Sequence, residues 1–141
     1  MKIKKLHPEA IIPTQGSAAA AGYDLYALYT CDLEPGSTYL MHTGLVIEIP
    51  EGFWGGIYAR SGLATKKGLR PANCVGVIDS DYRGEIMVAL HNDSTILQRI
   101  EAGDRIAQLV FHQQWTTDWE VVNELSDTTR GEGGFGSTGT N

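Results

Sequence analysis

The sequence contains no long apolar run and no apolar stretch behind its basic first residues. No segment approaches the roughly 18–20 consecutive apolar residues that cross a bilayer as a helix. The opening, MKIKKLHPEAIIPTQG, carries lysines but lacks the apolar region of a secretory signal. We therefore expect a cytoplasmic protein with no membrane partner.

The chain also has few cysteines, no cluster of histidines in its sequence and no net positive charge. The two cysteines, Cys31 and Cys74, form no CxxC pair, so we expect no disulfide and interpret both as small buried apolar residues. None of the four histidines has a histidine or cysteine neighbour at zinc-ligand spacing, which argues against a histidine metal site. The formal net charge of −6 argues against a duplex nucleic acid, which needs a basic face, so any nucleotide partner should be small.

The length and composition predict one all-β domain. The 141 residues suffice for a single domain, and 42% hydrophobic with 20% charged residues is typical of a globular chain. Ser61–Lys67 alone favours a helix, which Ser61 can cap and Gly68 can end. We expect a jelly-roll-like β-barrel over residues 1–129. The predicted strands are Lys2–Leu6, Tyr23–Tyr29, Thr38–Ile49, Phe53–Ala59, Cys74–Ile78, Glu85–His91, Ile96–Glu101, Arg105–Gln113 and Trp119–Glu124.

The last twelve residues, 130–141, hold five glycines and no apolar period. Such a segment cannot offset its own ordering entropy, so we expect a mobile tail. A solvated terminus is the simpler interpretation, although Arg130, Phe135, Ser137 and Thr138 supply a cation, an aromatic ring and two hydroxyls that suit a nucleotide. The GxGxxG match in residues 131–136 leaves no room for the βαβ unit of a dinucleotide fold, and no Walker loop is present.

Three segments place polar residues on or beside expected strands. Asp24 lies among apolar neighbours, where a turn or edge carboxylate is the simpler interpretation. Arg60 and Ser61 stand where a strand meets the short helix, which suits a phosphate or equally a plain cap beside a surface arginine. Gln108 lies in an apolar strand and needs a hydrogen-bond partner if buried, and a backbone group would serve.

A fourth segment, residues 73–88, is expected to form a hairpin in which Val75–Ile78 faces Glu85–Val88. Its bend contains Asp79, Asp81 and Tyr82. Aspartates are common in bends for structural reasons alone. An ionised carboxylate at such a place can also orient and deprotonate a water molecule.

Five motifs follow one another from residue 21 to residue 139: AGYDLYA, ARSGLATKKG, NCVGVIDSDYRGE, GDRIAQL and RGEGGFGSTG. In this order they resemble the motifs of the trimeric dUTP diphosphatases. One departure is Ala59, where many relatives carry proline, and this affects backbone stiffness rather than chemistry. The resemblance implies a homotrimer that hydrolyses dUTP to dUMP and pyrophosphate, limiting uracil incorporation into DNA.

The resemblance also implies roles for individual residues. Asp79 would be the general base that activates the water attacking the α-phosphorus. The resemblance leaves the role of Asp81 open. Asp24 would hold water ligands of a Mg²⁺ ion whose other ligands are the phosphates. The phosphates would meet Arg60, Ser61, Gly62 and Gln108.

The resemblance implies that the base and the sugar are recognised by a surface other than the one that meets the phosphates. Tyr82 would pack on the deoxyribose and exclude a 2′-hydroxyl, and main-chain groups would read the uracil edge at Asn73, Gly76, Val77, Ile78 and Met87. The tail would close over the nucleotide, with Phe135 on the base, Arg130 at the γ-phosphate, and Gly136, Ser137 and Thr138 around the phosphates. Each site would combine a hairpin, a phosphate segment and a tail from three different subunits.

Two alternatives remain open on the sequence alone. A dCTP deaminase shares the fold and some motifs but changes the base, whereas a catalytically silent trimer would only bind a nucleotide or a protein. The segment IDSDYRGE and the complete glycine tail favour the diphosphatase over both.

Overall fold

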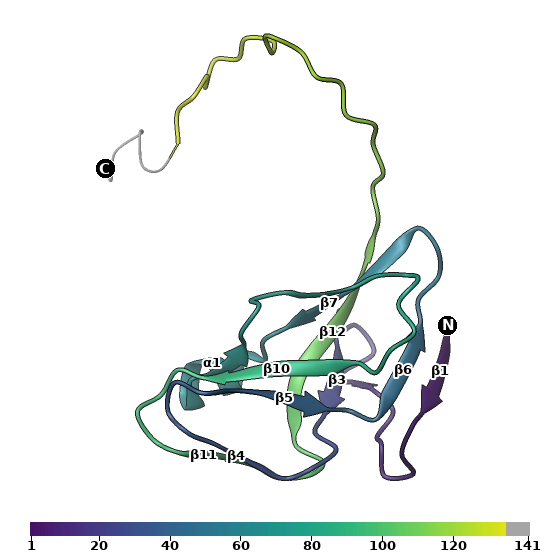
Figure 1. Cartoon of the computed structure of the whole chain (residues 1–141), viewed down its shortest axis with the longest axis vertical. Helices are drawn as coiled ribbons and strands as arrows, with labels where there is room; N and C mark the ends of the chain where they lie inside the picture. The colour runs from purple at the N-terminus through teal and green to yellow at the C-terminus, as the bar shows by residue number, and fades with distance from the viewer. Residues whose placement is uncertain (135–141) are drawn as a thin grey trace.

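The computed structural model describes residues 1–134. It is an all-β barrel with one short helix, which confirms the predicted fold class (Figure 1). The strands are β1 (Lys2–Lys5), β2 (Thr14–Gln15), β3 (Tyr23–Tyr26), β4 (Cys31–Leu33), β5 (Thr38–His42), β6 (Leu45–Glu48), β7 (Phe53–Tyr58), β8 (Leu69–Pro71), β9 (Gly76–Ile78), β10 (Met87–Asn92), β11 (Gln98–Ile100) and β12 (Arg105–Gln113), and the helix is α1 (Ser61–Lys67).

Two antiparallel sheets form the body of the barrel. The larger sheet has the strand order β2-β3-β12-β7-β9, and the smaller has the order β5-β10-β8. The pairs β1-β6 and β11-β4 lie at the sides. In the register of the larger sheet, Gln108 of β12 lies opposite Asp24 of β3 and Tyr58 of β7.

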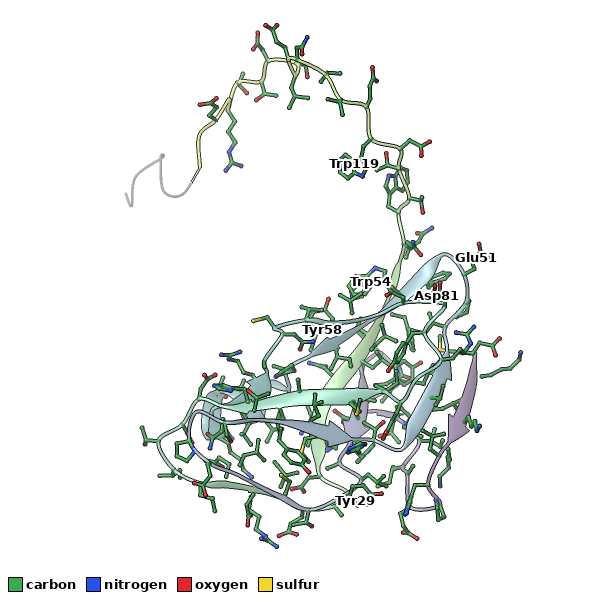
Figure 2. The ribbon with its side chains drawn as sticks, viewed as in Figure 1. Tyr29, Glu51, Trp54, Tyr58, Asp81 and Trp119 are labelled. Atoms are coloured by element: carbon green, nitrogen blue, oxygen red, sulfur yellow. The ribbon has the colours of Figure 1, made fainter. Side chains whose placement is uncertain are left out.

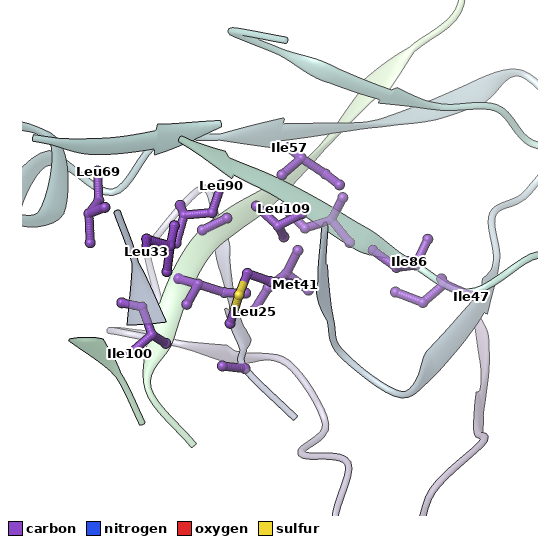
Figure 3. Close-up of a cluster of buried hydrophobic side chains, with 14 of the residues drawn as sticks. Leu25, Leu33, Met41, Ile47, Ile57, Leu69, Ile86, Leu90, Ile100 and Leu109 are labelled. Atoms are coloured by element: carbon purple, nitrogen blue, oxygen red, sulfur yellow. The ribbon is translucent and has the colours of Figure 1, made fainter. Parts of the chain in front are cut away.

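The hydrophobic core fills the space between the sheets (Figure 3). Leu25 and Leu109 come from the larger sheet, while Met41 and Leu90 come from the smaller, and all four are buried. The alternation of buried and half-buried residues along β10 follows the period of two that places successive side chains on opposite faces of a strand. One face of each sheet therefore builds the core and leaves the other face for sites and contacts.

The helix α1 has the predicted bounds, but its N-cap residue is not the predicted one. Arg60, not Ser61, occupies the N-cap position, and no side chain there makes a capping hydrogen bond. Gly68 ends the helix as predicted, in a left-handed conformation (φ 66°) that glycine adopts without strain, and its N–H donates to the carbonyl of Leu63.

Several predicted strands are wrong in detail. The continuous strand 38–49 is divided into β5 and β6 at Gly44, whose φ of +70° breaks the extended backbone. Three short strands, β2, β4 and β8, lie in segments for which the sequence predicts no strand. Each has only two or three residues, too few for a periodic pattern.

The predicted strand Trp119–Glu124 is also not formed. After β12 the chain runs away from the barrel as an extended arm, defined here as residues 114–134 (Figure 1). Trp119 is 90% exposed and Val121 is 97% exposed, and Figure 2 shows Trp119 well outside the barrel. The segment has the composition of a strand, but among residues 1–134 no strand lies beside it to accept its hydrogen bonds.

Within residues 1–134, no helix is long and apolar enough to cross a membrane. Cys31 and Cys74 are both free thiols. Cys31 is half-buried and packs against the core, whereas Cys74 is exposed, so the expectation that both are buried is wrong for Cys74.

Candidate functional site

A polar cleft of about 320 Å³ opens beside the first turn of α1. It lies between the loop that precedes β3, the junction of β7 with α1, and strand β12. Three of the sequence motifs thus meet in one place. The predicted residues that line this polar cleft are Asp24, Arg60, Ser61, Gly62 and Gln108.

Asp24 lies between two guanidinium groups at the floor of the polar cleft. Arg60 donates from Nε to Oδ1 at 2.8 Å, and Arg105 donates from Nη1 to Oδ2 at 3.2 Å. The Asp24 side chain is only 14% exposed. Because an ionised carboxylate offers about four lone-pair sites, Asp24 can still accept hydrogen bonds from water molecules in the cleft.

Gln108 uses its amide to fix its position in the polar cleft. Its Nε2 donates to the carbonyl of Ala59 at 2.9 Å, which is the backbone partner expected for a half-buried glutamine. A Cβ atom at Gly22 would lie 2.7 Å from its Oε1. Glycine at position 22 therefore leaves the room that the Gln108 carbonyl occupies.

The segment around Asp79 is not the predicted hairpin. Strand β9 pairs with β7 in the larger sheet, whereas β10 pairs with β5 and β8 in the smaller sheet. The intervening residues 79–86 therefore cross from one sheet to the other, and we call them the crossover loop. The sequence shows two strands flanking a turn, but it does not show which neighbours those strands choose.

Hydrogen bonds brace the crossover loop internally. The amide of Tyr82 donates to the carbonyl of Asp79 at 3.2 Å, and the Tyr82 hydroxyl donates to the carbonyl of Glu85 at 3.0 Å. Arg83 donates from Nη1 to the carbonyls of Ser80 and Tyr82, at 2.7 and 2.9 Å. Asp79 is exposed on this braced loop, where its carboxylate can reach a ligand.

The residues expected to read a base flank the crossover loop. Gly76, Val77 and Ile78 form β9, and Met87 begins β10. A Cβ atom at Gly76 would lie 3.1 Å from Nδ2 of Asn73, so the side chain of Asn73 packs directly on the backbone of β9. Asn73 therefore lies against β9, while Met87 begins a strand of the other sheet.

The polar cleft and the crossover loop are far apart within one chain. Met87 begins β10 directly after the loop, and Asn92 ends it beside α1, where the amide of Asp93 donates to the carbonyl of Gly68. A strand of this length spans about 17 Å. Figure 1 accordingly shows α1 next to the end of β10 and away from its start.

Asp81 points to a different cleft from Asp24. This second cleft of about 390 Å³ is lined by Asp81 together with Glu48, Glu51 and Arg83 among others. Figure 2 shows Asp81 and Glu51 close together at the edge of the barrel. Nothing in this position links Asp81 to the Asp24 carboxylate.

The tail residues divide between the described and the remaining part of the chain. Arg130 lies exposed in the arm, and its Nε donates to the carbonyl of Gly133 at 2.7 Å. It contributes nothing to the polar cleft of its own chain. Phe135, Gly136, Ser137 and Thr138 lie outside the described residues.

Sequence reasoning missed Arg105. It lies in the motif GDRIAQL and contacts the same carboxylate as Arg60, yet only Gln108 of that motif was assigned to a site. The available signal was its position at the start of an apolar strand, next to a turn. A surface arginine at a strand end is too common for that signal to decide.

Comparisons with known proteins confirm the resemblance. A family model described as dUTPase matches residues 8–139. The deoxyuridine 5'-triphosphate nucleotidohydrolase of Nautilia profundicola is 48% identical over 139 residues, covering 99% of this chain and 98% of that protein.

Solved structures agree with this match. The dUTPase of Staphylococcus bacteriophage 80alpha with dUPNHPP has a TM-score of 0.92 at 32% identity, covering 99% of this chain and 98% of that chain. A mutant dUTPase of phage phi11 of S. aureus, described with a structural Mg(II) ion, has a TM-score of 0.79 at 27% identity over 87% of this chain and 96% of that chain. This chain therefore belongs to the dUTPase family, and its activity is that of a deoxyuridine 5'-triphosphate nucleotidohydrolase.

Proposed function

We propose that this enzyme hydrolyses dUTP to dUMP and pyrophosphate by attack of water on the α-phosphorus, with Asp79 as general base. The observation that carries the assignment of Asp79 is the crossover loop, whose internal hydrogen bonds hold an exposed carboxylate beside the backbone of β9. A general base must be positioned before it can act, and the braced loop supplies that position. Asp79 takes the water proton as the oxygen–phosphorus bond forms and the pyrophosphate leaves.

The polar cleft is the proposed phosphate site. It is lined by the cation of Arg60, the hydroxyl of Ser61, the unobstructed backbone of Gly62 and the amide of Gln108. Arg60 is held by Asp24 at 2.8 Å, so its guanidinium is already oriented when phosphate oxygens arrive. Preorganised donors of this kind lower the barrier because they do not have to reorganise as charge develops.

Mg²⁺ is the proposed metal ion. Among residues 1–134 no group of three histidine, cysteine or acidic side chains could hold a metal, so a dedicated protein cage is absent from that part of the chain. The ion would then be held through water molecules, and Asp24 fits this role, because its free lone pairs can hold water ligands of an ion that the phosphates coordinate directly. When bound, Mg²⁺ would neutralise charge on the phosphate oxygens.

The surface formed by β9, the crossover loop and Met87 is the proposed recognition site for deoxyuridine. Main-chain groups of Gly76, Val77, Ile78 and Met87, with Asn73, would read the uracil edge. Cytosine would leave buried groups unpaired there, and the methyl group of thymine would collide. Tyr82 would pack on the deoxyribose, so that a ribose 2′-hydroxyl finds no room.

A homotrimer with shared sites is the proposed assembly. The loop that carries Asp79 and the cleft that carries Arg60 lie about a strand length apart in one chain, so Asp79 and Arg60 of one subunit cannot both lie beside the α-phosphorus of one nucleotide. The arm supports a partner chain as well, because Trp115, Trp119 and Val121 are large apolar side chains that are each about nine-tenths or more exposed. Three equivalent sites would then form around a closed three-fold ring.

In this assembly each site takes its crossover loop from one subunit, its polar cleft from a second and its tail from a third. The tail, residues 130–141, would close over the nucleotide through Arg130 and Phe135, with Gly136, Ser137 and Thr138 around the phosphates. Residues 1–129 would form the barrel domain. The enzyme would work in the cytoplasm on free nucleotides, with neither duplex nucleic acid nor membrane as a partner.

Hydrolysis in ¹⁸O-labelled water tests the reaction. With dUTP and Mg²⁺, we expect the label in dUMP and none in pyrophosphate, because water attacks the α-phosphorus. The same incubation with dCTP, dTTP and UTP should give little turnover. Label in pyrophosphate would contradict α-phosphorus attack, and release of ammonia from dCTP would favour the deaminase alternative.

A further inference from the structure

Glu85 lies where the crossover loop enters β10, and its two carboxylate oxygens contact the end of β5 and the turn that follows it. Oε1 accepts the backbone N–H of Gly44 at 2.7 Å, and Oε2 lies 2.8 Å from Nδ1 of His42. The Glu85 side chain is only 19% exposed. Since an ionised carboxylate can only accept, His42 must carry its proton on Nδ1 in this contact.

The turn that Glu85 contacts cannot shift easily. Gly44 has a φ of +70°, and a Cβ atom there would lie 2.9 Å from the Cβ of Ala10, so its backbone is packed on the N-terminal segment between β1 and β2. Its carbonyl also accepts the amide of Leu6 at 2.7 Å. A hydrogen bond from a fixed amide to a charged acceptor is both short and strong.

On its other side, the backbone of Glu85 sets the position of Tyr82. The Tyr82 hydroxyl donates to the Glu85 carbonyl at 3.0 Å. A Cβ atom at Gly84 would overlap the Tyr82 hydroxyl oxygen, so the phenol ring rests directly on the Gly84 backbone. A movement of the Glu85 backbone would therefore displace the Tyr82 ring.

The next residue is anchored independently of the Glu85 side chain. The amide of Ile86 donates to the carbonyl of Leu45 at 2.8 Å, and the Thr43 hydroxyl donates to the carbonyl of Ile86 at 2.6 Å. Loss of the Glu85 carboxylate would thus loosen residues 79–85 while β10 and the barrel stay in place.

We infer that Glu85 is a positioning residue for sugar selection: its carboxylate ties the crossover loop to Gly44 and His42, and thereby holds Tyr82 where it distinguishes deoxyribose from ribose. Glu85 does not touch the nucleotide in this account. The inference rests on the proposed function, in which Tyr82 packs on the deoxyribose.

Three variants test this role: Glu85→Ala, Glu85→Gln and His42→Ala. We expect Glu85→Ala to lower the ratio of kcat/KM for dUTP over UTP at least tenfold. Glu85→Gln should keep the ratio within about threefold of the original enzyme, because its amide oxygen accepts from Gly44 and its amide nitrogen donates to the other tautomer of His42. His42→Ala removes one of the two contacts and keeps the Gly44 contact, so it should lower the ratio by less than Glu85→Ala does.

A merely structural role would lower the melting temperature and reduce turnover of both nucleotides in parallel. An unchanged dUTP to UTP ratio in Glu85→Ala would therefore overturn the inference, as would a Glu85→Gln variant as unselective as Glu85→Ala. If Glu85→Ala does not fold, Glu85→Asp takes its place, because the shorter side chain cannot reach both partners. A wild-type ratio in Glu85→Asp would count equally against the inference.

Hydrogen exchange of the nucleotide-free enzyme separates this inference from the proposed function. We expect Glu85→Ala to speed exchange of the Tyr82 amide at least tenfold, while the amides of Val88 and Leu90 in β10 stay protected. Unchanged protection at Tyr82 would refute the positioning role even if the enzyme hydrolyses dUTP. Failure of the original enzyme to hydrolyse dUTP would instead refute the proposed function and leave the exchange result to decide the role of Glu85.

Discussion

Replacing Gly62 by alanine should make the enzyme more stable and bind its substrate less tightly. Gly62 is the second residue of α1, is exposed, and a Cβ atom there would meet nothing within 4 Å. Alanine is favoured over glycine in a helix by up to about 1 kcal/mol, so we expect a gain of roughly 0.5–1 kcal/mol near the helix start. For a chain of this size, that gain corresponds to a melting temperature about 2–4 °C higher.

The effect on the substrate has the opposite sign. Gly62 lines the polar cleft, where the proposed phosphates approach its backbone. A methyl group at this place would obstruct that approach, and we expect KM for dUTP to rise about tenfold, equivalent to about 1.4 kcal/mol. Thermal melting and steady-state kinetics on the same preparation measure both effects.

Thr65→Ala is the matched control on the same helix. Thr65 is exposed, does not line the polar cleft, and its hydroxyl donates back to the carbonyl of Ser61 at 2.7 Å. Alanine should again favour the helix, by up to about 0.7 kcal/mol, without changing KM. An unchanged KM in Gly62→Ala would refute the phosphate site, and a lower melting temperature would refute the account of α1.

Three further outcomes are expected. Asp79→Asn should lower the rate at least about 100-fold while leaving binding of a non-hydrolysable dUTP analogue intact, and a near-normal rate would exclude Asp79 as the base. Burial raises the pKa of the Cys31 thiol, so iodoacetamide at neutral pH should label exposed Cys74 first, and peptide mapping that found Cys31 labelled first would contradict this. The hydrogen bond from Arg99 lowers the pKa of Glu101, so this contact should stabilise the fold above about pH 4.3 and lose its effect as the pH falls through the depressed value. If the free energy of unfolding of Arg99→Ala and of the original enzyme falls in parallel as the pH is lowered, the contact is neutral.

Local signals in the sequence predicted α1 and the core strands. The helix ends at Gly68 because glycine alone adopts the left-handed conformation there at little cost, and that preference is visible in the sequence. The β-branched and apolar residues of β12 likewise predict a strand over Arg105–Gln113, the bounds that the structure has. These features depend on neighbours within a few residues, so the sequence contains them.

Pairing between distant strands could not be predicted in the same way. The two strands that flank Asp79 look like the halves of a hairpin, yet β9 joins β7 and β10 joins β5. The contact of Arg105 with Asp24 depends on the pairing of β12 with β3, which brings together residues 81 positions apart. The exposed Trp119 shows the same limit, because strand composition forms a strand only where a partner is available.

The shared active site is the central claim, and subunit mixing tests it most directly. Asp79→Asn subunits lack the proposed base, and subunits truncated after residue 129 lack the tail, so each homotrimer should be nearly inactive. Dissociated together and reassembled, they should form mixed trimers in which some sites combine an intact crossover loop with an intact tail from another subunit, and part of the activity should return. Mixed trimers that are verified by native mass spectrometry and remain as inactive as either parent would contradict the shared site.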